Sequence, residues 1–158
     1  MAEPSYMTRG GFETLKEELK RLKTIERPQC IKDIEVARAH GDLRENAEYE
    51  AAKNRQGFVE GRVKEIEHKL ATAKVVDLDG QTPEKVIFGA VITVEDVESG
   101  DRKTYQIVGV DEADIAEGKV SYQSPIARAM FGRSEDDEVV VKAPGGDRRY
   151  TIISIGLP

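Results

Sequence analysis

Apolar residues recur at three- to four-residue spacing along the first half of the chain, in two stretches separated by a polar segment. The first stretch contains Leu15, Leu19, Leu22, Ile25, Ile31 and Ile34, and the second contains Ala51, Phe58, Val63, Ile66, Leu70 and Ala73. Such spacing places the apolar side chains on one face of a helix. Two helices of this kind, joined by a short polar loop, predict an antiparallel helical hairpin.

Capping and helix-breaking residues indicate where the two arms begin and end. Thr8 can cap the first helix, and Gly41 suits the left-handed turn that follows a helix C-terminus. Pro28 predicts a kink or a local break in the first arm, because proline lacks a backbone donor. With roughly 28 residues in each arm at about 1.5 Å per residue, the hairpin is a rod on the order of 40 Å long.

After residue 74 the pattern changes from helical to alternating. Two strand hairpins are predicted around residues 99–100 and 144–146, with a short strand at 119–123 between them. Pro125 favours the first turn of a short helix that extends to about Phe131. The predicted fold class is therefore α+β, with a helical hairpin domain in residues 1–77 and a small antiparallel β-sheet domain with one short helix in residues 78–158.

The composition is typical of a soluble globular protein, since 39% of the 158 residues are hydrophobic and 34% are charged. No apolar run approaches the roughly 18 residues that span a bilayer. The N-terminal segment lacks the basic start and the apolar core of a signal peptide. We therefore expect a cytoplasmic protein that has no membrane partner.

The charge is distributed unevenly between the two halves. Residues 1–76 carry a net charge of +1 and residues 77–158 a net charge of −7. Binding of nucleic-acid phosphates requires a basic stripe, so this balance argues against a protein that binds free nucleic acid. The hairpin can still be polarised locally, because Arg38, Lys53 and Arg55 flank the acidic bend.

The acidic bend at residues 42–50 is the most informative segment. Asp42 and Glu45 have the spacing of a capping box, in which each side chain accepts from the backbone of the other residue. The same spacing can direct both carboxylates toward Mg²⁺, which takes about six oxygen ligands and often keeps waters and substrate phosphates among them. The two interpretations are compatible. If the carboxylates are ligands, another molecule must supply the rest of the site.

Other residues near the bend also allow two interpretations. Arg38, Lys53 and Arg55 are either solvated helix charges or phosphate contacts, and Tyr49 either braces the bend or stacks on a base. The usual catalytic motifs are missing from the sequence: there is no histidine pair at metal spacing, no phosphate loop and no GxSxG elbow. Any catalysis is therefore expected to be completed in a partner's site.

Six sequence segments carry a family resemblance. They are MTRGGFETLKEEL, the Arg27-Pro28 pair, ARAHGDLRENAEYEAA, QGFVEGR, VIFGA, and SPIARAMFG together with VKAPGG. The chain resembles the bacterial Gre transcript cleavage factors over nearly its full length. Arg44 stands where the family usually has lysine, which preserves the charge. The resemblance implies that the hairpin is an antiparallel coiled coil and that the second domain is FKBP-like in fold only.

The resemblance also implies a function that spacing alone does not give. Gre factors bind RNA polymerase and insert their coiled coil into its secondary channel, where they stimulate cleavage of the 3′ end of backtracked RNA. The nuclease site belongs to the polymerase, so the factor itself is not an enzyme. Contact with nascent RNA and DNA is expected only inside the elongation complex, and the protein is expected to be a monomer.

By position, Asp42 and Glu45 correspond to the residues that help to hold a shared Mg²⁺, which is not bound stably by the factor alone. Arg38 and Lys53 match basic positions that contact the extruded RNA, and Arg55 extends this basic patch. Ser124, Pro125 and Ile126 are candidates for polymerase docking, because this segment presents an apolar helix start. Ile126 is equally compatible with a place in the core.

Two competing functions stay open. A Gre-like inhibitor would occupy the channel without promoting cleavage, although such relatives carry a more crowded acidic tip. A prolyl isomerase would act through the second domain, but that chemistry requires an apolar aromatic pocket. The domain has no tryptophan and few aromatic residues.

Overall fold

The computed structural model describes residues 3–41, 43–78, 80 and 82–158, and the side chains of these residues except 40 and 43–46. Within these ranges the chain separates into two compact units. The helical unit is built mainly from Phe12–Ala73, and the sheet unit combines Ser5–Gly11 with Lys74–Pro158. The sheet unit therefore also contains an N-terminal segment. The domain boundary predicted from the sequence, between residues 77 and 78, assigned this segment to the hairpin domain.

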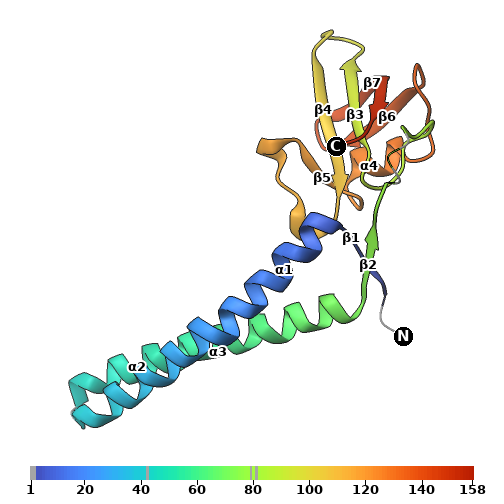
Figure 1. Ribbon diagram of the computed structural model, residues 1–158. Helices are drawn as coiled ribbons and strands as arrows, with labels where there is room; N and C mark the ends of the chain where they lie inside the picture. Colours follow the sequence, from blue (N-terminus) through green and yellow to red (C-terminus); the bar gives the residue numbers. More distant parts are fainter. Residues whose placement is uncertain (1–2, 42, 79, 81) are drawn as a thin grey trace. The chain divides into compact units, whose positions relative to one another are not determined.

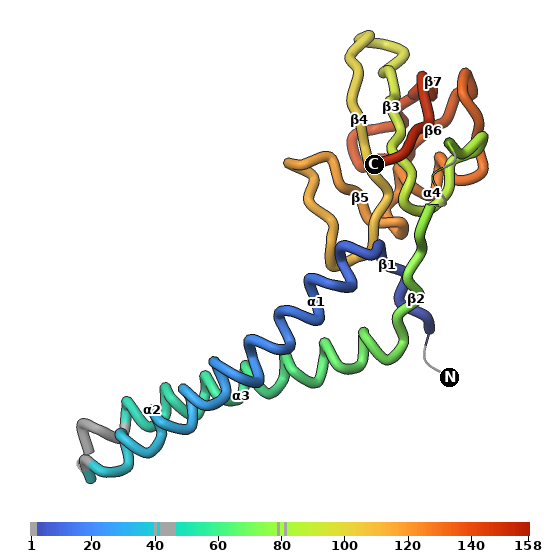
Figure 2. The backbone as a smooth tube through the Cα atoms, viewed as in Figure 1, coloured from blue at the N-terminus to red at the C-terminus, as the bar shows by residue number. Residues whose placement is uncertain are grey.

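The helical unit is a hairpin of two long arms (Figure 1). The first arm consists of α1 (Arg9–Arg21), η1 (Leu22–Glu26) and α2 (Arg27–His40), and the second is α3 (Leu43–Ala71). Figure 2 shows α2 and α3 lying side by side. The predicted hairpin is thus present, with its bend after Gly41.

The buried seam of the hairpin is narrower than the predicted apolar stripes. Its buried residues are Leu15, Leu22, Cys30 and Ala37 on the first arm and Val59, Val63 and Ile66 on the second. Four residues of the predicted stripes are exposed instead: Ile25 at 60%, Ile31 at 46%, Phe58 at 81%, and Ala51. An arm that packs against a single partner helix buries only about two residues in every seven, as in a coiled coil.

The first arm stays helical through Pro28, but its regular α-helical pattern is interrupted locally just before this residue. The chain forms a π-helical turn, η1, immediately before it, and the backbone N–H of Arg27 donates to the carbonyl of Leu22. Proline cannot donate to the carbonyl four residues earlier, and its ring would collide with that carbonyl in a regular helix. The wider turn lets the helix continue without that bond.

The sheet unit contains, among its described residues, a five-stranded sheet with the order β5-β4-β3-β7-β6. Its strands are β3 (Val91–Asp96), β4 (Arg102–Val108), β5 (Lys119–Ser121), β6 (Glu138–Ala143) and β7 (Gly146–Gly156). The two predicted strand hairpins are β3–β4 and β6–β7, and both are antiparallel. The short strand β5 instead pairs parallel with β4, so the sheet is mixed. Two consecutive strands can pair parallel only if the chain between them crosses over. Here the connection through η2 (Val110–Glu112) and η3 (Ile115–Glu117) provides this crossover.

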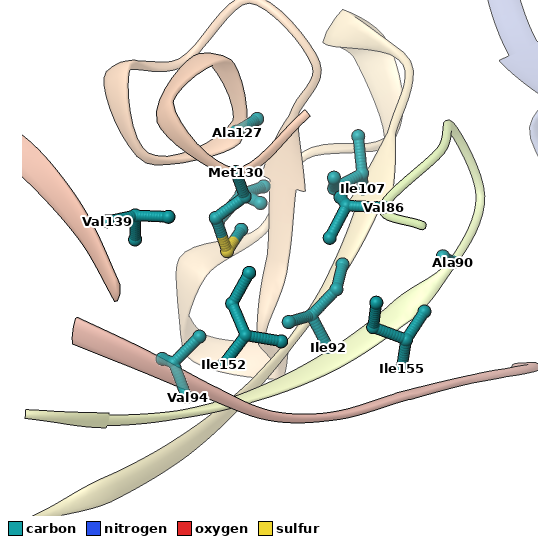
Figure 3. Close-up of a cluster of buried hydrophobic side chains, with 11 residues drawn as sticks. Val86, Ala90, Ile92, Val94, Ile107, Ala127, Met130, Val139, Ile152 and Ile155 are labelled. Carbon is teal, nitrogen blue, oxygen red and sulfur yellow. The ribbon is translucent and has the colours of Figure 1, made fainter. Parts of the chain in front are cut away.

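The core of the sheet unit lies between one face of the sheet and the short helix α4 (Pro125–Met130), as Figure 3 shows. Alternate residues of β3 point inward, and Ile92 and Val94 are fully buried. Met130 reaches the same cluster from α4 and is also fully buried. Met130 is therefore a core residue.

The N-terminal segment forms a strand that the sequence pattern did not predict. β1 (Ser5–Thr8) pairs with β2 (Ala73–Val76) in a separate two-stranded sheet. Both strands are only four residues long, which is too short for alternation to be recognised. In the part of the chain that the structure describes, no helix has the length and apolar character needed to cross a membrane.

Candidate functional site

The bend of the hairpin begins where the backbone of Gly41 ends the helix α2. Gly41 adopts the left-handed conformation with φ of 65° and ends α2, and α3 begins at Leu43. Asp42 lies outside the described residues. Glu45 belongs to the first turn of α3, but its side chain also lies outside the description. The proposed roles of these two carboxylates, as caps or as metal ligands, stay predictions.

Arg38 and Tyr49 come together across the hairpin, close to the bend. The guanidinium of Arg38 on α2 lies 5.9 Å from the centroid of the Tyr49 ring on α3. This distance is that of a cation–π contact. Tyr49 is half-buried, so the contact supports the interpretation that it braces the bend.

Lys53 and Arg55 have different environments although both lie on α3. The Lys53 side chain is exposed, and no described residue forms an ion pair with it. Arg55 Nη2 donates to Glu26 Oε2 at 2.7 Å, and its Nη1 lies 3.6 Å from Asp33 Oδ2. The hydrogen bond to Glu26 raises the pKa of Arg55 above its ordinary value. Arg55 thus connects the two arms.

Further ion pairs connect the arms, and the sequence analysis did not identify them. Arg27 donates to both carboxylate oxygens of Glu60, at 2.7 and 2.9 Å. Arg62 donates to Glu18, with its shortest contact at 2.7 Å. The bond from Arg27 lowers the pKa of Glu60. Opposite charges on two arms can be paired from sequence only if the register between the arms is already known.

The predicted docking residues lie at the start of α4. Ser124 Oγ donates to the carbonyl of Ser121 at 2.7 Å and accepts from the backbone N–H of Ala127 at 3.3 Å, so Ser124 caps the helix. Pro125 is exposed in the first turn. Ile126 is partly buried against the core, which limits how much of its side chain a partner can contact.

An aromatic cluster supports the chain immediately before α4. The ring of Tyr122 lies edge-on to Tyr6, with centroids 5.6 Å apart, and edge-on to Phe88 at 5.7 Å. Such pairs stabilise by about 0.5–1.5 kcal/mol beyond the area that they bury. Tyr6 belongs to β1, so the N-terminal segment contributes to the surroundings of the predicted docking residues. Its role was missed because 116 positions separate Tyr6 from Tyr122.

Comparisons with known proteins cover nearly the whole chain. Residues 5–75 match the family described as "Transcription elongation factor, N-terminal", and residues 81–156 match "Transcription elongation factor, GreA/GreB, C-term". The chain is 55% identical to "Transcription elongation factor GreA" of Anaeromyxobacter sp. (strain K), over 96% of this chain and 91% of that protein. It is 57% identical to the protein of the same name from Methylococcus capsulatus, over 94% and 95%. Among solved structures, that of the transcription factor Gfh1 is 28% identical, covers 98% of this chain and 99% of its own, and has a TM-score of 0.46.

Proposed function

The chain belongs to the GreA/GreB family of transcription elongation factors, and on this premise we propose that it stimulates RNA polymerase to cleave backtracked RNA. In this proposal the sheet unit docks on the polymerase and the helical hairpin enters the secondary channel with its bend foremost. The nuclease site is that of the polymerase, so the protein acts as a non-enzymatic cofactor. It would work in the bacterial cytoplasm, as a monomer.

The observation that carries this proposal is the construction of the hairpin. The helix α3 has 29 residues, so at about 1.5 Å per residue it is roughly 43 Å long. A buried seam and the pairs Arg27–Glu60 and Arg62–Glu18 hold it to the first arm. A long, narrow and internally braced element that ends in an acidic bend suits insertion into a channel better than it suits a separate active site.

Asp42 and Glu45 are the residues that would hold Mg²⁺ at the bend. Their chemistry fits, because Mg²⁺ prefers carboxylate oxygens, and two carboxylates supply only part of its roughly six ligands. In a two-metal site, the ions stabilise the attacking and the leaving oxygens of the phosphoryl group. The incomplete ligand set explains why the protein would hold no metal stably by itself.

The basic residues behind the bend would guide the RNA. Arg38 and Lys53 are both exposed, and phosphate contacts of this kind fix the position of a strand without reading its sequence. Arg55 would contribute mainly by holding the arms together, since its guanidinium already pairs with Glu26. All contacts with RNA or DNA would occur inside the elongation complex.

The decisive experiment uses stalled, backtracked elongation complexes and measures the release of short 3′ RNA fragments. Asp42→Asn and Glu45→Gln keep the capping ability of the side chains but remove a charged ligand oxygen. We expect each variant to cleave at least about tenfold more slowly, a loss of about 1.4 kcal/mol of transition-state stabilisation. Polymerase binding and thermal stability should stay near those of the wild type, and elevated Mg²⁺ should restore part of the rate.

Glu50→Gln is the matched control, because it removes an exposed carboxylate of α3 that lies outside the predicted ligand pair. It should cleave at the wild-type rate. Near-normal cleavage by the Asp42 and Glu45 variants would show that these residues are caps. Inhibition of elongation by the wild-type protein, without any release of fragments, would instead indicate a factor that only blocks the channel.

A further inference from the structure

The crossover between β4 and β5 exposes apolar side chains that no part of the proposed function uses. Ile115 is 80% exposed and Val110 is 54% exposed. Figure 1 shows this segment, in orange, projecting from the edge of the sheet. Single exposed apolar residues are common and require no explanation. Here the two residues lie five positions apart in one segment whose backbone is held at both ends.

The end that carries Val110 is fixed by Glu112. Its carboxylate accepts from the backbone N–H of Gly109 at 3.1 Å and of Thr8 at 3.0 Å, and it also accepts from the Thr8 hydroxyl. A side chain at position 109 would bring its Cβ within 2.6 Å of the Tyr6 carbonyl oxygen. The backbone of β1 therefore lies directly against this turn and supports it.

The end that carries Ile115 is fixed by Asp114 and Gly118. The Asp114 carboxylate accepts from the backbone N–H of Ala116 at 3.1 Å. The backbones of Asp114 and Lys119 exchange two hydrogen bonds, each of 2.9 Å. Gly118 has φ of 74°, and a Cβ there would lie 2.7 Å from the Thr104 carbonyl oxygen. Ile115 is thus exposed on a turn whose backbone is already hydrogen-bonded, so a partner that binds it would have to order little additional backbone.

The charge of the segment decides which partner fits. Residues 110–118 contain Asp111, Glu112, Asp114 and Glu117 and no lysine or arginine. The Lys119 ammonium that follows lies 3.7 Å from the Glu117 carboxylate. Nucleic acid is excluded as a partner, because its phosphates would be repelled. An apolar pocket with lysine or arginine at its rim complements both the exposed isoleucine and the carboxylates around it.

We propose that Ile115 and Val110 form a docking surface for such a basic-rimmed apolar pocket on RNA polymerase. This inference rests on the proposed function. The surface adjoins the predicted docking residues at Ser124, since β5 connects the two segments and is only three residues, or about 10 Å, long. β5 is also an edge strand of the sheet, so both segments lie along one edge. In this proposal the polymerase contacts both segments, and Ile115 is the apolar anchor of the interface.

The test measures the affinity of full-length protein for RNA polymerase. Ile115→Ala removes most of the anchor without disturbing the core, and we expect it to weaken binding about tenfold, as truncation of an interface anchor typically does. Val97→Ala is the matched control, because Val97 is 49% exposed in the turn between β3 and β4 and lies outside the proposed surface. It should bind like the wild type. Glu117→Lys should also weaken binding, most strongly at low salt.

Each outcome decides the proposal. Wild-type affinity of the Ile115→Ala variant, or an equal loss with Val97→Ala, would overturn the docking surface while the cleavage function stands. Sedimentation showing that Ile115 instead holds two copies of the chain together would overturn it as well. A wild-type protein that does not bind polymerase at all would overturn the proposed function and this surface with it.

Discussion

Replacing Ile66 and Phe58 by alanine should change the stability of the hairpin very differently, although both residues belong to the predicted apolar stripe of α3. Ile66 is 0% exposed in the seam, whereas Phe58 is 81% exposed. Ile66→Ala removes buried methyl and methylene groups worth about 0.8 kcal/mol each and leaves a cavity, for a total of about 2–5 kcal/mol. The better helix propensity of alanine offsets only a few tenths of a kcal/mol of this loss.

For a unit of this size, 1 kcal/mol changes the melting temperature by roughly 4–8 °C. Ile66→Ala should therefore lower the Tm of the helical signal in circular dichroism by at least about 8 °C. Phe58→Ala removes little buried surface and improves helix propensity, so its Tm should stay the same or rise slightly. A similar loss of stability in both variants would refute the assignment of the seam, as would an Ile66→Ala variant that melts like the wild type.

Two further predictions concern the backbone and the ion pairs. Gly118→Ala should destabilise the sheet unit more than Gly100→Ala, because both glycines have positive φ but only at Gly118 would a Cβ meet a backbone atom, the Thr104 oxygen at 2.7 Å. Thermal melting of the two variants measures the difference, and equal losses would contradict the proposed close contact. The hydrogen bonds from Arg27 and Lys69 lower the pKa values of Glu60 and Glu65, so these carboxylates stabilise the folded arms while they are ionised. That stability should be complete above the unfolded glutamate pKa of about 4.3 and should be lost as the pH falls through the lower folded values. Glu60→Gln should flatten this dependence in pH-dependent melting curves, and an unaltered profile would count against the pair.

The sequence by itself determined the features that depend on neighbouring residues. The two helical arms follow from a local period, and the bend after Gly41 follows from a residue that tolerates positive φ. The strand hairpins β3–β4 and β6–β7 follow from alternation and turn residues. The six motifs identified the family, which the comparisons confirm. Asp42 and Glu45 were also singled out by sequence, and their roles stay predictions.

Only the tertiary structure decided the features that depend on register between distant segments. The seam includes Ile66 and excludes Phe58 because each arm has one partner helix, and the apolar pattern does not show where that partner lies. The Arg27–Glu60 pair joins residues that are 33 positions apart, and the Glu112–Thr8 contact joins residues that are 104 apart. Local propensity contains no information on such distances. The exposure of Ile115 is likewise a property of the folded chain, because its turn lies against the Thr104 carbonyl of β4.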